Sequence, residues 1–289
     1  MHQDGDPVTS SVFNHSAEEE DPAGRAAPPI DVTRAHPARM YDYYLDGKTN
    51  FAADRAAAEQ ALAAFPSLRT TARQNRAFLL RAVDHLARLG VRQFLDIGTG
   101  IPIEGRNTHD AAQDLDPSSR VVYVDNDPIV LAHARALLTS HPDGATAYID
   151  ADIHDPESIL DHPVLAATLD MDRPLAVLLI AVMHFVPDED EPADILRRLT
   201  ERLPSGSYLA LSHVTGDFDP DGWARIVETY RAAGIPAQTR SRGEVTELVR
   251  DWELMPPGVE SVSHWRPAPG SALPEPAEVS CYGLLARKR

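Results

Sequence analysis

The chain has 289 residues, of which 43% are hydrophobic and 25% charged, so it can form one large α/β domain with an additional segment. Its formal net charge of −17 argues against a nucleic acid as the main partner, because proteins that bind nucleic acids present a basic surface. The single Cys281 excludes a cysteine cluster for zinc, and the lack of a signal peptide or long apolar run predicts a cytoplasmic protein with no metal and no membrane partner.

Three parts of the chain differ in composition. Residues 1–29 mix Asp, Glu, Ser, Pro and Gly with almost no apolar side chains, which predicts a disordered tail. Residues 30–73 contain two helical stretches separated by Asp46-Gly47-Lys48, the second of them rich in alanine. Because residues 74–289 contain enough strands to close a sheet of their own, we expect 30–73 to form an extra helical cap or lid.

Strand and helix patterns alternate through residues 74–289. Most of the strand patterns are continuous apolar runs, of the kind buried on both faces of a parallel sheet. The expected strands are 93–97, 120–125, a weaker one that ends at 148–152, a fourth within the apolar stretch 174–186, and then 207–213, 259–265 and 279–287. Helical patterns separate them, including one over 156–169. This order predicts a doubly wound, mostly parallel α/β sheet, whose ligands bind at the carboxyl ends of the strands.

The glycine-rich stretch Gly98-Thr99-Gly100-Ile101-Pro102-Ile103-Glu104-Gly105 follows the first strand and predicts a turn that a ligand can approach closely. A dinucleotide-binding turn needs Gly or Ala where Ile103 stands, and Pro102 lacks an N–H group that would face a pyrophosphate. A P-loop needs Lys and Ser or Thr where Arg106-Asn107 stands. Both phosphate-binding interpretations, including an NAD-dependent oxidoreductase, are therefore disfavoured.

Three acidic residues lie at the ends of three successive strands. Asp96 precedes the glycine turn, and a carboxylate there suits a ligand with an ammonium group better than one with a phosphate. Asp125 ends the second strand, where nucleoside-binding folds place a carboxylate on the ribose hydroxyls. Asp152 follows the third strand. Each acid alone could be a helix cap or a solvated loop end, but the three together indicate a nucleoside site.

The motif Asp96-Ile97-Gly98-Thr99-Gly100 resembles the first motif of class I S-adenosylmethionine-dependent methyltransferases. Further stretches are similar to a bacterial S-adenosyl methyltransferase family of largely uncharacterised proteins. They are ARMYDYYLDGKTNF from Ala38, FLDIGTGIP from Phe94, VVYVDNDP from Val121, Asp150-Ala151-Asp152, and Gly258–Trp265. The resemblance covers the chain from about Ile30 to its end.

The resemblance implies a Rossmann-like sheet of seven strands in the order 3-2-1-4-5-7-6, with the last strand antiparallel, and S-adenosylmethionine as the bound cofactor. The domain 74–289 would then bind this cofactor. The resemblance implies no particular substrate.

Cofactor contacts are expected at the residues that match these motifs. The ammonium group is expected near Asp96 and the carbonyl groups of Gly98 and Gly100, with Thr99 in the same turn. The ribose is expected at Asp125 with Asn126 beside it, and the resemblance implies an adenine contact at Asp152 and Ile153. For the cofactor carboxylate, the candidates are Arg76 and Lys48, with Arg39 a weaker third.

The aromatic side chains of the N-terminal segment, Tyr44 among them, suit a lid that covers a flat, cationic ligand. The alternative is a fixed pair of helices that packs on the sheet and touches no ligand.

Methyl transfer from a sulfonium requires positioning and exclusion of water, and it requires a base only if the acceptor carries a proton. His184 and His213 follow the fourth and fifth strands, so they are the candidate bases, although a structural histidine is the more common role. We therefore predict S-adenosylmethionine-dependent methyl transfer to a small-molecule acceptor. The alternatives are a non-catalytic protein that binds S-adenosylmethionine or S-adenosylhomocysteine and, less favoured, the oxidoreductase. The oligomeric state is open, and a homodimer is one of the arrangements that the sequence allows.

Overall fold

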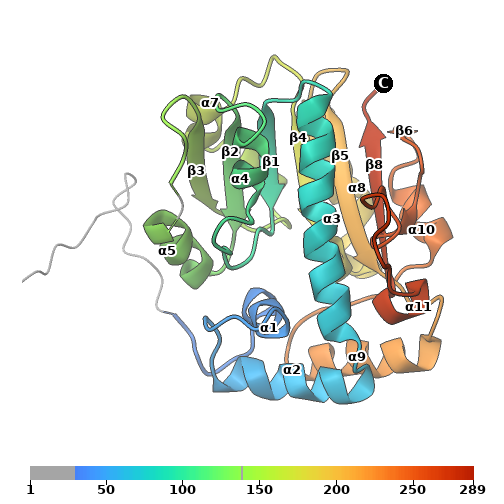
Figure 1. The fold of residues 1–289 in the computed structure, drawn as a ribbon. Helices are drawn as coiled ribbons and strands as arrows, with labels where there is room; N and C mark the ends of the chain where they lie inside the picture. Colours follow the sequence, from blue (N-terminus) through green and yellow to red (C-terminus); the bar gives the residue numbers. More distant parts are fainter. Residues whose placement is uncertain (1–29, 138) are drawn as a thin grey trace, which may run out of the picture.

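The computed structural model describes residues 30–137 and 139–289, so the predicted tail 1–29 lies outside the described residues. A central sheet runs in the order β3-β2-β1-β4-β5-β8-β6, and β7 also pairs with β8 (Figure 1). The strands from β3 to β5 are parallel, whereas β8 is antiparallel to β5. The strands are β1 (Gln93–Ile97), β2 (Arg120–Asp125), β3 (Ala145–Asp150), β4 (Ala176–Ile180), β5 (Tyr208–Val214), β6 (Glu253–Leu254), β7 (Glu260–Ser261) and β8 (Cys281–Arg287).

Helices cover both faces of the sheet and one of its ends. Those before β3 are α1 (Pro37–Tyr44), α2 (Ala52–Ala64), α3 (Leu68–Arg88), α4 (Thr108–Gln113) and α5 (Pro128–Leu137). Those after β3 are α6 (Pro156–Leu160), α7 (Pro163–Thr168), α8 (Pro192–Glu201), α9 (Pro220–Ala232), α10 (Arg242–Leu248) and α11 (Pro276–Val279), with the short 3-10 helices η1 (Met183–Phe185) and η2 (Asp188–Asp190). None of the helices in the described part is long and apolar enough to cross a membrane.

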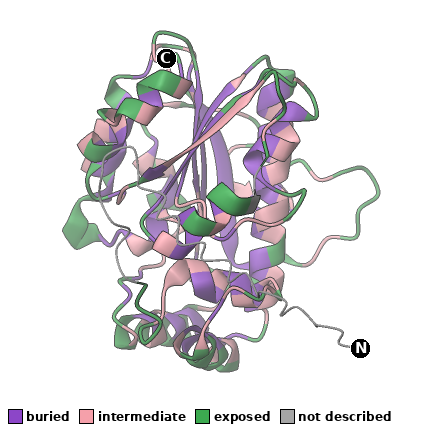
Figure 2. Ribbon diagram, turned by 90° about the vertical axis from the view of Figure 1, so that its left-hand side faces the viewer, coloured by how far each residue is buried: buried purple, intermediate pink, exposed green. Residues whose placement is uncertain are grey.

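Alternating side chains of the central strands form two cores. Phe94 of β1 packs with α3 and α4 on one face, whereas Leu95 and Ile97 pack with α6, α7, α8 and α10 on the other. Successive side chains in a strand point to opposite faces, so Asp96 lies on the same face as Phe94, beneath α3. The inner strands are buried along most of their length (Figure 2). This double burial explains why their sequences are continuous apolar runs.

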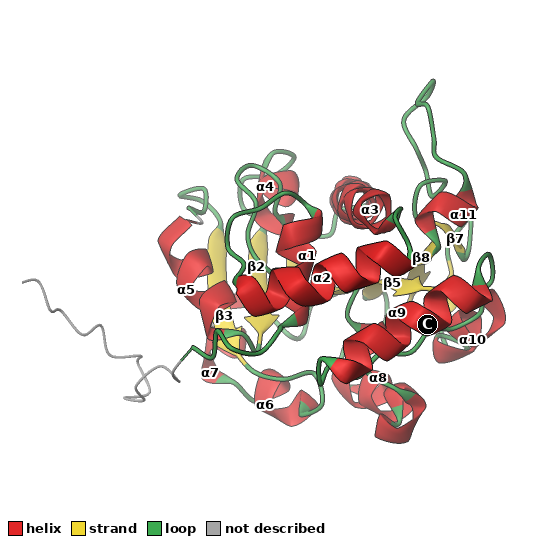
Figure 3. Ribbon diagram, turned by 90° about the horizontal axis from the view of Figure 1, so that it is seen from below, coloured by secondary structure: helices red, strands yellow, loops and turns green. Residues whose placement is uncertain are grey.

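A third core lies beyond the carboxyl ends of the strands. There α1, α2 and the first turns of α3 pack against α9, through Met40, Tyr44, Leu68, Trp223 and Tyr230 among others. Seen from below, α2 and α9 run beside each other across this end of the molecule (Figure 3). The helices of the predicted cap thus pack against α9, a helix that follows β5 in the chain. The predicted boundary at residue 73 falls within the continuous helix α3.

Two local predictions are wrong. The helix expected over 156–169 is two helices, because Pro163 disfavours a helical conformation at His162 and cannot donate an N–H group to continue α6. The strand expected over 259–265 is a strand only at Glu260–Ser261, since the chain then turns so that Trp265 N–H donates to Ser261 O at 2.9 Å. That turn buries Trp265 against Phe78 of α3. The short β6 occupies the sheet edge beside β8, so the strand order agrees with the predicted one.

Candidate functional site

A cavity of about 500 Å³ lies between the carboxyl ends of β1, β2 and β4 and the helices of the third core. One side of it is formed by the glycine turn and the acidic strand ends. The other side is formed by α1, the start of α3, η1, α9 and the loop 234–238. Cavities of this size hold small organic ligands in many proteins. The fold therefore places a ligand-sized space where the sequence predicted one.

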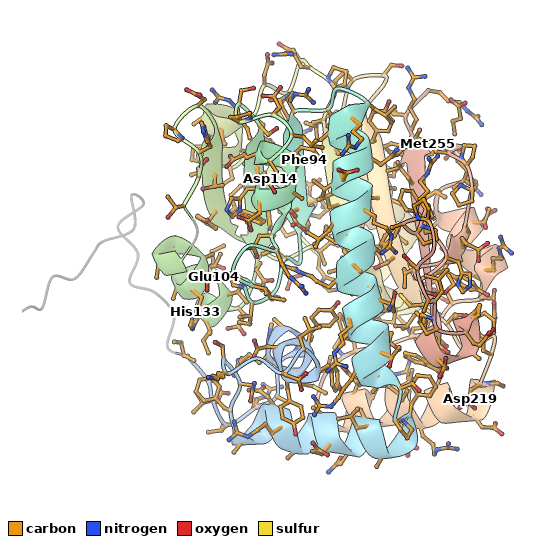
Figure 4. The ribbon with its side chains drawn as sticks, viewed as in Figure 1. Phe94, Glu104, Asp114, His133, Asp219 and Met255 are labelled. Atoms are coloured by element: carbon orange, nitrogen blue, oxygen red, sulfur yellow. The ribbon has the colours of Figure 1, made fainter. Side chains whose placement is uncertain are left out.

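The glycine turn approaches the cavity with two residues in the left-handed region. Gly98 has φ +71° and Gly100 has φ +69°, and both line the cavity. A Cβ atom at Gly98 would lie 2.7 Å from Cγ2 of Val182, so a side chain fits neither the conformation nor the space. The following residues Glu104 to Arg106 are exposed, and Figure 4 labels Glu104 on this loop, near α5. Only the first part of the turn can therefore contact a ligand in the cavity.

Asp96 is a buried carboxylate that forms no ion pair with the side chains of residues 30–137 and 139–289. Its Oδ2 accepts a hydrogen bond from Thr108 Oγ1 at 2.5 Å, and Thr108 begins α4. Burial raises the pKa of Asp96 to about 6, although the Thr108 hydrogen bond and the nearby Arg76 guanidinium oppose this change. Arg76, on α3, donates from Nη2 to Asn107 Oδ1 at 3.0 Å, while its buried Nε has no partner among the described residues. The Asp96 carboxyl group and the Arg76 guanidinium group therefore both lie at this end of the cavity.

Asp125 holds the glycine turn as well as facing the cavity. Its Oδ2 accepts from the Gly100 N–H at 2.9 Å and its Oδ1 from the Asp127 N–H at 3.0 Å. Burial nevertheless raises its pKa to about 7, because these backbone hydrogen bonds only partly replace water. Asp125 therefore has unused capacity to accept hydrogen bonds from a ligand.

Asp152 lies at the more open end of the site. It accepts from Asn126 Nδ2 at 2.7 Å and from the His154 backbone N–H at 2.9 Å, and the His154 ring contacts it at 2.6 Å. Burial acts to raise its pKa, but these hydrogen bonds outweigh burial and lower it below 3.8. Asp152 is thus ionised at neutral pH, and with Asn126 and Ile153 it forms one wall of the cavity.

The side of the cavity opposite the acids is aromatic. Tyr41, Tyr44, Phe185, Trp223 and Tyr230 all line it. The hydroxyl groups of Tyr44 and Tyr230 lie 3.1 Å apart and share a hydrogen bond, and the ring of Tyr230 stacks on Phe185 with a centroid distance of 5.9 Å. This wall joins α1 and α9 directly, so the N-terminal segment is part of the cavity.

A buried ion pair also fixes the N-terminal segment to the loop that follows β2. Arg39 of α1 donates from Nε to Asp127 Oδ2 at 2.8 Å, and its Nη1 lies 3.8 Å from Asp54 Oδ2 of α2. All three side chains are at least nine-tenths buried. Asp127 follows Asp125 by two residues, so α1 is connected through Arg39 to the carboxylate that holds Gly100.

The sequence model of the S-adenosyl methyltransferase family matches residues 23–289. The chain belongs to this S-adenosyl methyltransferase family. As a member it is an S-adenosylmethionine-dependent methyltransferase, and S-adenosylmethionine is its methyl donor. The predicted family, activity and cofactor are thereby confirmed.

Two solved structures are similar over most of this methyltransferase. A DUF574 family protein from Streptomyces avermitilis MA-4680 is 47% identical, with a TM-score of 0.86 over 90% of this chain and all of that one. A protein from Thermobifida fusca YX, described as a candidate methyltransferase, is 36% identical, with a TM-score of 0.82 over 91% of this chain and 98% of that one. No curated protein matches the chain.

The residues of the cavity fit the chemistry of S-adenosylmethionine. Its cationic ammonium and sulfonium groups suit a site whose buried carboxylate, Asp96, accepts a hydrogen bond from Thr108 and forms no ion pair within the described part of the chain. No set of His, Cys, Asp and Glu side chains in the described ranges is arranged to hold a metal ion.

The structure places most of the predicted site residues together. Those that line the cavity are Asp96, Gly98, Thr99, Gly100, Asp125, Asn126, Asp152, Ile153, Arg76, Tyr44 and His184. Lys48 and His213 do not. Lys48 lies on the loop between α1 and α2, beyond the last turn of α1, so its expected position at the cavity is wrong. His213 is fully buried in β5 behind His184, where its ring lies 5.7 Å from that of His184.

Several residues of the methyltransferase cavity had no recognisable sequence signal. Trp223 and Tyr230 lie on the inner face of α9, where they look like ordinary core residues of an amphipathic helix. Their spacing of seven residues predicts only that they share a helix face. Phe185 likewise follows His184 in an apolar run. The contacts with α2 determine where α9 packs on the protein. The sequence of neither helix predicts these contacts.

Proposed function

We propose that the acidic side of the cavity binds S-adenosylmethionine through the residues predicted from the sequence. In this assignment Asp96 and the Gly98 and Gly100 carbonyls receive the ammonium group, Asp125 receives the ribose hydroxyls, and Asp152 with Ile153 contacts the adenine. The observation that carries the proposal is that three strand-end carboxylates and the glycine turn line one cavity. Two of these carboxylates are buried with raised pKa values, as expected for groups that await a cation or a hydroxyl donor.

Arg76 is our candidate for the cofactor carboxylate. It lines the cavity, and its Nε is buried without a hydrogen-bond partner in the described part of the chain. A buried guanidinium nitrogen without a partner is costly, so a ligand that accepts from it would be favoured. Lys48 is withdrawn from this role because it lies away from the cavity.

The acceptor is a small molecule in this proposal. The space beside the acidic wall is closed by α1, α9 and the loop 234–238, which leaves a pocket rather than a groove for a polymer. When bound, the cofactor supplies a methyl group on an activated sulfonium. The chain then has to hold the acceptor in line with that group and exclude water, and the aromatic wall is suited to both tasks.

Residues 30–73 act, in the same proposal, as the cap of the cofactor site. The aromatic wall and the Arg39–Asp127 ion pair support this assignment. They also indicate that α1 is docked in the state described here, so opening would require Arg39 and Asp127 to separate. In this proposal the cap stays packed over the bound cofactor, and the opening of the cap limits the rate at which the cofactor product is exchanged for a new cofactor.

Calorimetry with S-adenosylhomocysteine tests the cofactor assignment. We expect the wild type to bind S-adenosylhomocysteine and not NAD. Replacing Arg76→Met removes a charge-assisted contact, so the affinity should fall about 10- to 100-fold. Arg73→Met is the matched control, because Arg73 is on the same helix but exposed and paired only with Asp46. Equal affinities for the wild type and a folded Arg76→Met variant would contradict the role of Arg76.

A further inference from the structure

The aromatic side of the cavity contains no carboxylate. The lining residues from η1, α9, the loop 234–238 and the first turns of α3 are apolar, aromatic or uncharged polar, apart from His184. The acids that line the cavity are Asp31 near its N-terminal edge and the three strand-end acids on the cofactor side. A cationic acceptor on the aromatic side would therefore lie in a low-dielectric space without a counter-charge, which is unfavourable.

A fixed positive charge lies behind this wall. Arg240 is 3% exposed and donates to Met183 O at 3.2 Å, to Val186 O at 3.0 Å and to the exposed Asp188 at 2.6 Å. Its Nη1 also lies 2.9 Å from His213 Nε2. The other nitrogen of His213, Nδ1, is 2.7 Å from Val214 O and must donate to it, so Nε2 is the unprotonated nitrogen that accepts from Arg240.

The surroundings of His184 disfavour a second proton on its ring, so His184 is not suited to accept a proton as a general base. His184 packs against His213 and its Nδ1 is buried without a partner in the described residues, so no acceptor would stabilise the second N–H of an imidazolium. Burial, with the neighbouring His213 and Arg240, lowers the pKa of His184 well below its ordinary value. An unpaired lone pair costs less than an unpaired N–H group, which favours the neutral tautomer with its proton on Nε2.

On the basis of the proposed cofactor site, we propose that the acceptor is a planar aromatic alcohol that binds as its phenolate, with the anionic oxygen at His184. His184 lines the cavity, and in this proposal its Nε2–H group donates to the phenolate oxygen. The buried guanidinium of Arg240, whose paired carboxylate Asp188 is exposed to solvent, adds a positive charge behind His184 that favours the anion. The hydroxyl proton is released to solvent when the acceptor binds. The phenolate oxygen then forms the O–CH₃ bond with its lone pair as the S–CH₃ bond breaks, and the bonding pair stays on sulfur. The products are a methyl ether and S-adenosylhomocysteine.

The aromatic wall accounts for the planar shape of this acceptor. Phe185 and Tyr230 are stacked, with an interplanar angle of 29°, and Trp223 stands on the same helix face as Tyr230. Aromatic faces of this kind pack favourably on a flat ring. His184 is adjacent to Phe185, with ring centroids 4.3 Å apart, so a ring lying along this wall can present a substituent to His184.

The test uses 4-nitrophenol, whose phenol and phenolate forms absorb light at different wavelengths. The probe is titrated with pH in the presence of protein saturated with S-adenosylhomocysteine. We expect the phenolate to bind at least about tenfold more tightly than the phenol, so that the bound probe ionises about one pH unit lower than the free probe. A second probe of similar size, 4-nitrobenzylamine, is cationic at neutral pH and should bind at least about tenfold more weakly than the phenolate.

Two variants assign the effect to His184. His184→Phe keeps an aromatic ring but removes the donor, so it should lose at least half of the shift while still binding S-adenosylhomocysteine. His85→Phe is the matched control, because His85 lies on α3 at a separate surface pocket. The proposal is overturned if bound 4-nitrophenol ionises at or above the pH of the free probe, or if the cationic probe binds equally well. Binding of neither probe also overturns it when S-adenosylhomocysteine binds normally, whereas failure of S-adenosylhomocysteine to bind refutes the proposed cofactor site instead.

Discussion

Replacing Asp125→Asn should stabilise the free protein and weaken cofactor binding at the same time. The carboxylate is buried with a pKa of about 7, against an ordinary value of 3.8. Because the pKa is raised, the folded state binds the proton more tightly than the unfolded state, and stability is lost as the pH rises through the interval from 3.8 to 7. At about 1.4 kcal/mol for each pH unit, the ionised group costs roughly 4 kcal/mol at pH 8.

Asparagine removes this cost but can accept only one of the two backbone hydrogen bonds. The lost bond, to Gly100 or to Asp127, costs about 1–2 kcal/mol, so the net stabilisation at pH 8 is roughly 2–3 kcal/mol. For a chain of this size, whose unfolding entropy is about 0.6 kcal/mol/K, that corresponds to an increase in Tm of about 3–5 °C. If Asp125 accepts the ribose hydroxyls, the affinity for S-adenosylhomocysteine should fall about 10- to 100-fold.

Thermal unfolding with and without S-adenosylhomocysteine, together with calorimetry, measures both effects. Asp127→Asn is the control, because Asp127 is equally buried but is paired with Arg39. Breaking that pair leaves the buried Arg39 with only the more distant carboxylate of Asp54 and should cost about 3–5 kcal/mol. A lower Tm for free Asp125→Asn would refute the assignment of a costly buried charge, and unchanged affinity in this variant would remove Asp125 from the cofactor site.

Two further predictions concern ionisation and the cap. Ionised Asp96 and Asp125 are the forms that receive an ammonium group and hydroxyl donors, and both are largely protonated at pH 5.5, so calorimetry should find S-adenosylhomocysteine binding about 10- to 100-fold weaker there than at pH 8. An affinity independent of pH over this range would contradict that assignment. Arg39→Met leaves Asp127 and Asp54 buried without their cation, so trypsin should cut residues 30–73 faster, and S-adenosylhomocysteine should protect this variant less than the wild type. Unchanged cleavage would show that the ion pair does not hold the cap.

The sequence by itself determined the parts of the fold that depend on local patterns. Continuous apolar runs identified β1 and β2, because a strand buried on both faces has no polar side to display. Gly98 and Gly100 identified the turn, since both need positive φ values that other residues rarely adopt. Acids at or just beyond the carboxyl ends of parallel strands come together at one sheet edge whatever else surrounds them, so Asp96, Asp125 and Asp152 share one cavity.

Only the tertiary structure decided what closes the cavity. Trp223 and Tyr230 are far from α1 in sequence, and an amphipathic helix specifies which of its faces is buried but not the partner that buries it. The sequence predicts equivalent positions for His184 and His213 after neighbouring strands. In the structure His184 lies in η1 and lines the cavity, whereas His213 lies within β5 and is held by Arg240 and Val214. Lys48 lies within the predicted aromatic signature, but α1 ends before it and the following loop places it away from the cavity. These differences arise from packing between distant segments, which no local pattern encodes.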